Sequence, residues 1–479
     1  MPHRKHVILS LLLLLSLVLA ACGDSTATQA PAASNTTAAA GATTAASSGS
    51  GVELSMWTWK IAHVAGIQAV AANYQAKTGV KVNVQAFNPD DTYRTKITTS
   101  AQSGDLPDIL SYWSGSTASG GEWDMGAAGL LTELTGKVDS AWQSQFLAGT
   151  YNKTSVLTQD VLDACAKDPK CNFKNLKVGQ SFSVPYLAGN AFFVYGSKSL
   201  MTKAGLDPNK APATAEEWLT MMQTIKQKTG TPGVVTGVKN PDVLQYWLYN
   251  PLMMASCGQD TYDAIYNGRD SFANPCSLNV LKWINSIAQN DLWAADILST
   301  DIDPADVAFT QGKAAFDIGG TYTLSFLLAQ GMKSDDIISF AIPPLKGSKY
   351  DKLAVNASAL IDAMVTKSSK HQAEALDFIK FLTSPDQMAV FAKTVGDLPA
   401  VKISSDPAKV GPVMAGLVSS ISDNSPFAVS KAQALDDPSK VLKLGLQQFI
   451  TKEDTPDSLV KKVDAANKSA WDARGGPKA

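Results

Sequence analysis

The amino-acid sequence predicts an α/β fold in which parallel-rich sheets are flanked by helices. Residues 52–112 alternate strand, helix, strand, helix and strand, and the same alternation resumes after residue 192. Such alternation is typical of sheets whose parallel strands are joined by crossover helices. No apolar stretch after residue 22 approaches the length of a membrane span, so these sheets are expected to form a soluble body.

Five elements are predicted in the first part of the chain from the period of their hydrophobic residues. Gly79 is expected to close the first helix, because glycine adopts the left-handed backbone that ends many helices. In chain order the elements are strand 53–59, helix 61–77, strand 80–84, helix 92–103 and strand 109–112.

The later part of the chain is predicted to continue in the same way and to end in helices. Thr214 precedes the helix 215–228 as its N-cap, with Glu217 at the third helical position, a pattern typical of a capping box. The remaining elements are strand 192–195, helices 278–290 and 304–312, strands 314–318 and 338–342, helix 371–382 and a mostly helical tail over 438–471.

The N-terminus has the pattern of a secretory signal. A basic start precedes the uncharged apolar run 7–21, which is too short to span a bilayer comfortably. Leu19-Ala20-Ala21-Cys22 resembles a bacterial lipobox, which would make Cys22 the lipid-modified first residue of the mature protein. The alternative is an ordinary signal peptide with an incidental cysteine. Behind the signal peptide 1–21, residues 22–51 are rich in Ala, Thr, Ser and Gly and are predicted to form a flexible linker.

Four of the five cysteines remain once Cys22 is set apart. An even set in an exported chain suggests disulfides, and four cysteines allow three pairings. The short spacings favour Cys165–Cys171 and Cys257–Cys276. A zinc site is the competing interpretation, but the spacings match no zinc pattern and the four histidines are scattered. Neither a metal nor a cofactor is expected.

The length and charge of the chain restrict the possible partners. The part of the 479 residues that follows the linker is long enough for two or three domains with proper cores. The formal net charge is −2, without a basic stripe or a run of like charge. Nucleic acid is therefore not expected as a partner.

Several short motifs follow one another between residue 52 and about residue 400. They are YQAKTGVKV at 74–82, SGDLPDI at 103–109, GLLTELT at 129–135, AGLD at 204–207 with PATAEEW at 212–218, and FTQGKAAF at 309–316. Their order and spacing resemble those of extracellular solute-binding protein family 1, the sugar-capturing lipoproteins of ABC importers. Two positions depart from that family: Asn356-Ala357 replaces a common pair of glycines, and Tyr322 stands where many members carry tryptophan.

The resemblance implies a two-lobed, periplasmic-binding-protein-like fold of type II, with a hinge that the chain crosses three times. It also implies a monomer that passes its ligand to the subunits of a membrane permease. The crossings are expected near 187–190, 341–343 and 394–399. The expected division is lobe 1 from 52–188 and 343–396, and lobe 2 from 189–342 and 397–479.

Side chains that follow the predicted strands are the candidate ligand-binding residues, because parallel sheets bind ligands at the carboxyl ends of their strands. They mix aromatic rings, amides and hydroxyls, which suits a sugar that stacks its C–H faces and hydrogen-bonds through its hydroxyls. A phosphate or amino-acid site would be expected to show arginine or a glycine-rich anion nest instead. The candidates are Trp59, Lys60, Trp113, Ser114, Asn190, Gln245, Trp247, Tyr322 and Asn356.

The tryptophans need to be divided between core and ligand site, since most tryptophans in regular elements belong to a core. Trp57 and Trp59 would share one face of a regular strand. Trp57 lies deeper and is expected in the core, whereas Trp59, at the carboxyl end, is expected to contact ligand. Trp113 is favoured further because it follows a strand among small polar residues. Trp218, Trp283 and Trp293 lie in or beside amphipathic helices and are expected in the core.

The leading interpretation is a binding protein for a sugar or oligosaccharide, and another polar ligand in the same role is the alternative. A secreted carbohydrate-active enzyme would need paired carboxylates at the strand ends. Glu122, Asp124 and Asp317 are scattered along the sequence and suggest no such pair. A serine hydrolase would need a Gly-x-Ser-x-Gly elbow, and 117–121 lacks its first glycine. The chain is therefore not expected to be an enzyme.

Overall fold

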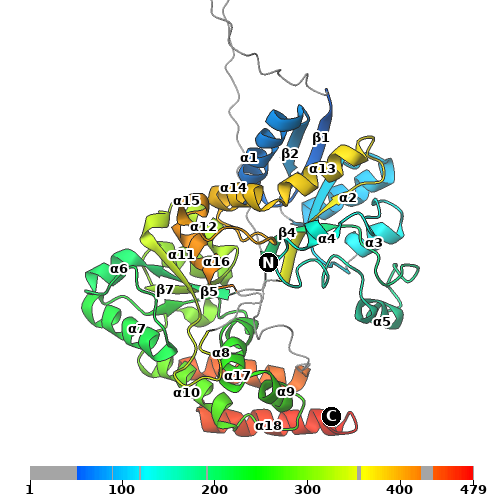
Figure 1. Ribbon diagram of the computed structural model, residues 1–479. Coiled ribbons are helices and arrows are strands. Elements are labelled where there is room, and N and C mark those ends of the chain that lie inside the picture. The colour runs from blue at the N-terminus through cyan, green and yellow to red at the C-terminus, as the bar shows by residue number, and fades with distance from the viewer. Residues whose placement is uncertain are drawn as a thin grey trace, which may run out of the picture. The chain divides into compact units, whose positions relative to one another are not determined.

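Figure 1 shows a computed structural model, which describes residues 51–88, 90–117, 120–189, 192–352, 358–421 and 435–477. Within these ranges the chain forms two sheets flanked by helices, with strand orders β2-β1-β3-β9-β4 and β6-β7-β5-β8. The predicted signal peptide, the linker and Cys22 lie outside the described residues. In the described part of the chain, no helix is both long and apolar enough to cross a membrane.

The first sheet contains the predicted alternation of strands and helices. β1 (Glu53–Thr58) pairs in parallel with β2 (Lys81–Ala86) and with β3 (Ile109–Trp113). The crossover helices α1 (Ile61–Thr78) and α2 (Asp90–Ser103) lie between them in the sequence. Gly79 closes α1 as predicted, with a φ of 79° and its N–H donating to the Gln75 carbonyl. The five predicted elements are thus confirmed, with ends shifted by one or two residues.

Two strands of the first sheet were not predicted from the sequence. β9 (Ser358–Val365) runs antiparallel to β3 and also to β4 (Val184–Gly189). The other helices of this part are α3 (Glu122–Ala127), α4 (Ser140–Gln143), α5 (Gln159–Lys167), α13 (Gln372–Leu382) and α14 (Pro385–Val395). Both α13 and α14 pack on α1.

The second sheet is centred on β5 (Phe192–Ser197). β5 pairs antiparallel with β7 (Phe316–Gly320) and β8 (Ile337–Ala341), and the short β6 (Val234–Val235) pairs parallel with β7. The predicted α/β class is therefore confirmed. In each sheet one strand is reversed relative to the others, β9 in the first sheet and β5 in the second.

Helices surround the second sheet and form most of the remaining chain. Thr214 caps α7 (Ala215–Thr229) as predicted: its hydroxyl accepts the Glu217 N–H, and the Glu217 carboxylate accepts the Ala213 N–H. The other helices are α6 (Lys198–Lys203), the π-helix η1 (Leu244–Tyr249), α8 (Asn250–Cys257), α9 (Gln259–Tyr266), α10 (Pro275–Gln289), η2 (Ile297–Ser299), α11 (Ile302–Thr310), α12 (Thr323–Ala329), η3 (Ser334–Asp336), α15 (Pro407–Val410), α16 (Pro412–Ser419), α17 (Asp436–Thr451) and α18 (Pro456–Asp472).

Each sheet has its own hydrophobic core. The core of the first sheet includes Tyr74, Ile109 and Phe378, and that of the second is built around Trp218. Trp218 is fully buried and lies 5.8 Å, ring centroid to centroid, from Trp283. Trp218, Trp283 and Trp293 are all buried, as predicted.

The chain passes between the two sheets after Gly189, after Tyr350 and again near residue 403. Residues 342–350 still belong to the second sheet, because Pro344 accepts the Ala215 N–H and the Tyr350 N–H donates to the Ala255 carbonyl. Residues 398–402 still belong to the first sheet, because the Leu398 and Ala400 backbones hydrogen-bond to β4, and Ala400 also accepts the Leu147 N–H. α16 then packs on β8 of the second sheet. The second and third passages therefore lie a few residues later than the predicted 341–343 and 394–399.

Both favoured disulfides are present. Cys165 is bonded to Cys171 in the loop that ends α5, and Cys257, at the end of α8, is bonded to Cys276 at the start of α10. Among the described residues no group of three or more His, Cys, Asp and Glu side chains could hold a metal ion.

Removing the second disulfide with Cys257→Ser and Cys276→Ser is expected to lower the free energy of unfolding by about 3 kcal/mol, because the bond closes a loop of 19 residues in the unfolded chain. Urea denaturation of the double variant measures this loss. The matched variant Cys165→Ser with Cys171→Ser opens a loop of only 6 residues and should lose about 2 kcal/mol. Equal stability of the parent and the first double variant would contradict the expectation.

Candidate functional site

The strand registers bring four of the predicted ligand-binding residues to one edge of the first sheet: Trp59, Lys60, Trp113 and Ser114. β1 and β3 are parallel, so their carboxyl ends share an edge. At that edge Trp113 pairs with Ile361 of β9, and β4 ends where Gly189 pairs with Ser358. Beyond Gly189 the chain enters β5 at Phe192, opposite the last residue of β7. The edge of the first sheet and the end of β7 are thus joined by the shortest passage between the sheets.

Trp113 and Lys60 form the accessible part of this edge in the first sheet. Both side chains are partly exposed. The Lys60 ammonium lies 5.1 Å from the centroid of the Trp113 ring, within the range of a cation–π contact. The Trp113 ring therefore combines an open aromatic surface with a neighbouring hydrogen-bond donor.

Trp59 supports Trp113 from the inside of the core. Only 3% of its surface is exposed. Its ring lies 4.9 Å from that of Trp113 and stacks on Tyr93 at 5.7 Å. Trp57 is the partly exposed member of the pair, packed edge-on against Phe87. The predicted division of the two tryptophans is thus reversed, because Trp59 lies beyond the end of β1 and does not follow its pleat.

Ser114 directs its side chain into the protein. Its hydroxyl donates to Asp362 Oδ1, and its N–H donates to the Leu360 carbonyl 2.9 Å away. These contacts fix the turn that follows β3. Ser114 therefore orients the Trp113 backbone in this structure, and direct contact of its hydroxyl with ligand stays a prediction.

In the second sheet an aromatic pair lies at the start of β5. The Trp247 and Phe192 rings stack with centroids 4.6 Å apart and planes 16° apart. Trp247 belongs to the π-helix η1, and such turns are frequent at functional sites. Only 8% of the Trp247 surface is exposed, so Phe192, which is partly exposed, offers more surface than its predicted neighbour. No local pattern distinguished Phe192 from other aromatic strand residues.

Gln245 is fully buried and ties η1 to two other helices. Its side-chain amide donates to the Tyr266 hydroxyl at 3.4 Å and accepts from the Ser439 hydroxyl at 2.8 Å. Both ends of the amide are therefore used inside the protein, and the structure gives Gln245 a structural role instead of the predicted contact with ligand.

Tyr322 lies at the carboxyl end of β7 and is partly buried. A Cβ at Gly320 would overlap the Tyr322 ring, so the glycine lets the ring lie against the strand. Next to it, the Thr321 hydroxyl donates to the Ala188 carbonyl of β4 at 3.1 Å. Burial raises the pKa of the Tyr322 phenol, which keeps it a neutral hydrogen-bonding group. Asn190 and Asn356 lie outside the described residues and stay predictions.

The fold forms two buried pairs of carboxyl groups that were not predicted from the sequence. Glu122 lies beside Asp362, and Asp317 of β7 lies beside Asp306 of α11; each of the four is at most 2% exposed. The partners of the first pair are 240 positions apart, so no local pattern could join them. Solvent does not reach either pair in this structure.

Burial and mutual repulsion raise the pKa of Asp306, and burial raises that of Asp317. The pair therefore retains at least one proton where free carboxyls would be ionised. Thr323, directly after Tyr322, is hydrogen-bonded to Asp306. The pair is thus connected through Thr323 to the segment that follows β7 and contains Tyr322.

Asp306→Asn is expected to remove much of the pH dependence that this pair gives to stability. Because the folded-state pKa values are raised, the folded protein holds protons that the unfolded chain releases above about pH 3.9. The resulting stabilisation is complete at lower pH and falls as the pH rises, by about 1.4 kcal/mol per pH unit and proton. In the variant only Asp317 can hold such a proton, so urea denaturation should show the variant gaining on the parent between about pH 5 and pH 8. A difference from the parent that is constant with pH would contradict this.

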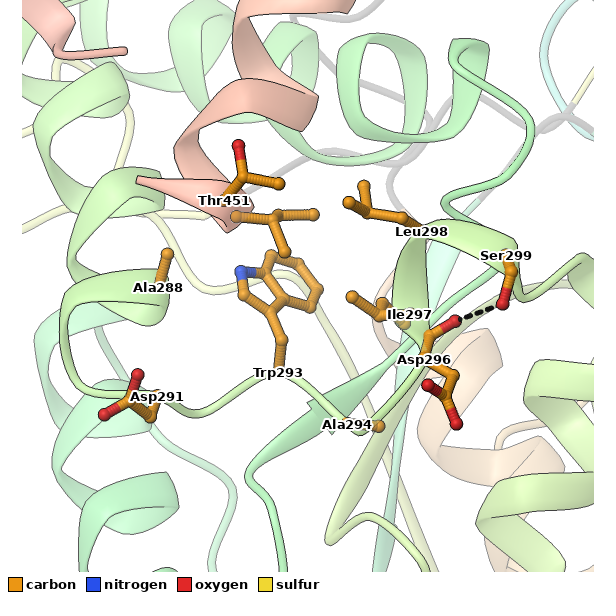
Figure 2. A pocket seen from close by; sticks show the side chains of 10 residues that line it. Ala288, Asp291, Trp293, Ala294, Asp296, Ile297, Leu298, Ser299 and Thr451 are labelled. Atoms are coloured by element: carbon orange, nitrogen blue, oxygen red, sulfur yellow. Dashed lines mark hydrogen bonds between the residues drawn. The ribbon is translucent and has the colours of Figure 1, made fainter. Parts of the chain in front are cut away.

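A separate pocket lies around Trp293, beside the edge strand β6 of the second sheet (Figure 2). Its volume is about 500 Å³. Figure 2 shows the Trp293 ring between aliphatic side chains, with Asp291 and Asp296 at the rim and the Ser299 hydroxyl donating to the Asp296 carbonyl. It contains none of the predicted ligand-binding residues. The full lining is Ala288, Asp291, Trp293, Ala294, Asp296, Ile297, Leu298, Ser299, Ile450 and Thr451.

The chain thus forms two sheets flanked by helices, which three chain passages join, and aromatic side chains lie where the first passage meets the sheets. This is the fold class of the solute-binding proteins. The chain belongs to the bacterial extracellular solute-binding protein family, whose sequence profile matches residues 60–389. The predicted resemblance is therefore confirmed.

Individual relatives support the same assignment. The chain is 23% identical over 412 residues to a multiple sugar-binding protein of Streptococcus mutans serotype c, covering 84% of this chain and 83% of that protein. It resembles maltose-bound MalE3 of T. maritima with a TM-score of 0.57 and 18% identity, over 87% of this chain and 99% of the other. RafE in complex with raffinose gives a TM-score of 0.55 at 16% identity, over 88% and 99%. At such identities these structures establish the fold.

Proposed function

We propose that this protein captures a sugar or oligosaccharide and delivers it to the permease of an ABC importer. The observation that carries the proposal is the partly exposed Trp113 ring at the end of β3, with the Lys60 ammonium beside it. The chain leaves the first sheet from the same edge, at the end of β4. An aromatic face with adjacent hydrogen-bond donors suits the alternating C–H and hydroxyl surfaces of a pyranose. The relatives named for multiple sugars, maltose and raffinose favour the same ligand class.

Capture would proceed by closure of two lobes about the three passages. One lobe would contain the first sheet and its core, and the other the second sheet with the helical tail. A ligand touching Trp113 on one side and Phe192 or Tyr322 on the other would favour the closed form, because only that form offers both sets of contacts. No covalent chemistry is part of this proposal.

Cys22 would anchor the protein to the outer face of the cell membrane through a lipid. The linker 22–51, behaving as a flexible coil, would give a typical reach of roughly 30 Å. That reach would keep a monomeric receptor near its permease. Cys22→Ala is expected to release the protein from the membrane fraction into the soluble fraction, and an unchanged membrane fraction would contradict the anchor.

A thermal-shift screen with mono- and oligosaccharides, amino acids and short peptides tests the ligand class. A ligand at 100 times its dissociation constant stabilises the folded protein by about 2.7 kcal/mol, enough for a clear rise in melting temperature. The proposal expects that rise with at least one sugar and with none of the amino acids or peptides. Stabilisation by a non-sugar ligand alone would favour the alternative of another polar solute, and turnover of a labelled glycan would reveal an enzyme.

A further inference from the structure

The turn that follows Trp113 rests on a buried cluster of two carboxyls and three serines. Asp362, in β9, is fully buried and is the centre of the cluster. Its Oδ1 accepts from the Ser114 hydroxyl, and its Oδ2 accepts from Ser155 at 2.7 Å and contacts the Ser183 hydroxyl at 2.6 Å. Asp362 thus joins β9 to the turn after β3 and to the residue before β4.

Glu122 completes the cluster from the first position of α3. It is also fully buried, and its Oε2 lies 2.7 Å from the Ser183 hydroxyl. The carboxyl also lies near the backbone N–H of Gly115, which has a left-handed φ of 64°, and Glu122 Oε1 has no hydrogen-bond partner among the described residues. Ser114 is therefore hydrogen-bonded to Asp362, and Glu122 lies next to Gly115 and is joined to Asp362 through the Ser183 hydroxyl.

The hydrogen-bond pattern requires a shared proton. Ser183 has a single hydroxyl proton but contacts an oxygen of both acids, so one of the two carboxyls must donate to it. Burial raises the pKa of Asp362, but Asp362 accepts from Ser114 and Ser155, and these bonds favour its ionised form over that of Glu122. Glu122 then carries the proton. Consistent with this, burial and the neighbouring Asp362 raise the pKa of Glu122 well above its ordinary value.

The surroundings provide no positive charge to balance a second ionised acid. Among the described residues, no Lys, Arg or His forms an ion pair with either carboxyl. The other titratable groups facing Asp362 are the phenols of Tyr151 and Tyr186, both neutral. Ionisation of Glu122 would place two negative charges in a closed site, and their repulsion would push the two carboxylates apart and disturb the residues that contact them.

We propose that Glu122 and Asp362 are positioning residues for ligand capture, which hold the 114–115 turn so that Trp113 presents its ring, and that their shared proton links ligand affinity to pH. The inference rests on the proposed function, in which Trp113 contacts the sugar. Affinity is greatest while Glu122 keeps its proton and falls as the pH rises far enough to remove it.

Two substitutions separate positioning from simple stabilisation. Glu122→Gln keeps the shape of the side chain and a donor for Ser183 but has no proton to lose. Asp362→Asn replaces one of the two acceptor oxygens by a donor, so Ser114 and Ser155 can no longer both donate to this side chain. The matched control is Asp454→Asn, which alters a carboxyl that is 5% exposed and paired with Lys462 in the C-terminal helices.

The first measurement is calorimetric affinity for the sugar found by the thermal-shift screen, from pH 6 to pH 10. We expect the affinity of the parent to fall toward alkaline pH and that of Glu122→Gln to stay level over the same range. Asp362→Asn should bind about tenfold more weakly at pH 6, the effect of one lost charge-assisted hydrogen bond, and Asp454→Asn should match the parent. Identical pH profiles for the parent and Glu122→Gln would overturn the proposal, even if Asp362→Asn fails to fold.

The second measurement needs no ligand and therefore separates this inference from the proposed function. Amide hydrogen exchange at residues 113–117, compared at one alkaline pH, should be faster in the parent than in Glu122→Gln and unchanged between the parent and Asp454→Asn. Equal exchange in the parent and Glu122→Gln would overturn the inference. Absence of any sugar binding by the parent would overturn the proposed function, whatever the exchange shows.

Discussion

Trp113→Ala is expected to weaken sugar binding by about 10- to 100-fold, the loss of 1.4 to 2.8 kcal/mol that an aromatic contact at the centre of a site commonly provides. The reason is geometric: Trp113 is the partly exposed ring at the carboxyl end of β3, with Trp59 behind it and Lys60 beside it. Isothermal titration calorimetry with the cognate sugar measures the loss.

Trp57→Ala is the matched control for this experiment. Trp57 is also partly exposed, but it pairs with Leu110, three positions before Trp113 along the same sheet. Its partners are the Phe87 ring at 5.1 Å and the Lys96 ammonium at 4.8 Å. The control should bind the sugar as the parent does. Unchanged affinity in Trp113→Ala, or an equal loss in Trp57→Ala, would contradict the assignment of the ligand site.

Trp59→Ala is expected to lower the free energy of unfolding by about 3–5 kcal/mol, as the removal of a large buried aromatic side chain usually does. Trp59 is 3% exposed and contacts the rings of Tyr93, Tyr112 and Trp113. Urea denaturation gives the loss, and Trp59→Phe, which keeps a ring in the stack, should recover part of it. If Trp59→Ala keeps the stability of the parent but loses sugar binding, Trp59 contacts the ligand and this expectation is wrong.

Local patterns in the sequence predicted the elements that are consecutive in the chain. β1, α1, β2, α2 and β3 follow one another, and each carries its own hydrophobic period and end signals. β9 and β4 were missed as strands because their pairing depends on segments far apart in sequence: Val184 pairs with Ala363. The disulfides were predicted because each bond closes a short loop.

Residues of the candidate site could be predicted from the sequence only where a residue's position along a strand determines whether its side chain is exposed. Trp113 ends β3 and is partly exposed, as that rule requires. Gln245 failed the rule because Ser439, 194 positions away, covers it. The acid pair Glu122–Asp362 was missed for the same reason: its members meet through the fold and share no local pattern.

Small-angle X-ray scattering with and without the cognate sugar tests the central claim most directly, because the claim is that a sugar is held between the parts that contain the two sheets. If both sides contribute contacts, saturating sugar should reduce the radius of gyration of the parent, whereas Trp113→Ala should need a higher sugar concentration for the same change. A radius of gyration that stays constant while calorimetry shows saturation would contradict capture by closure of the two lobes.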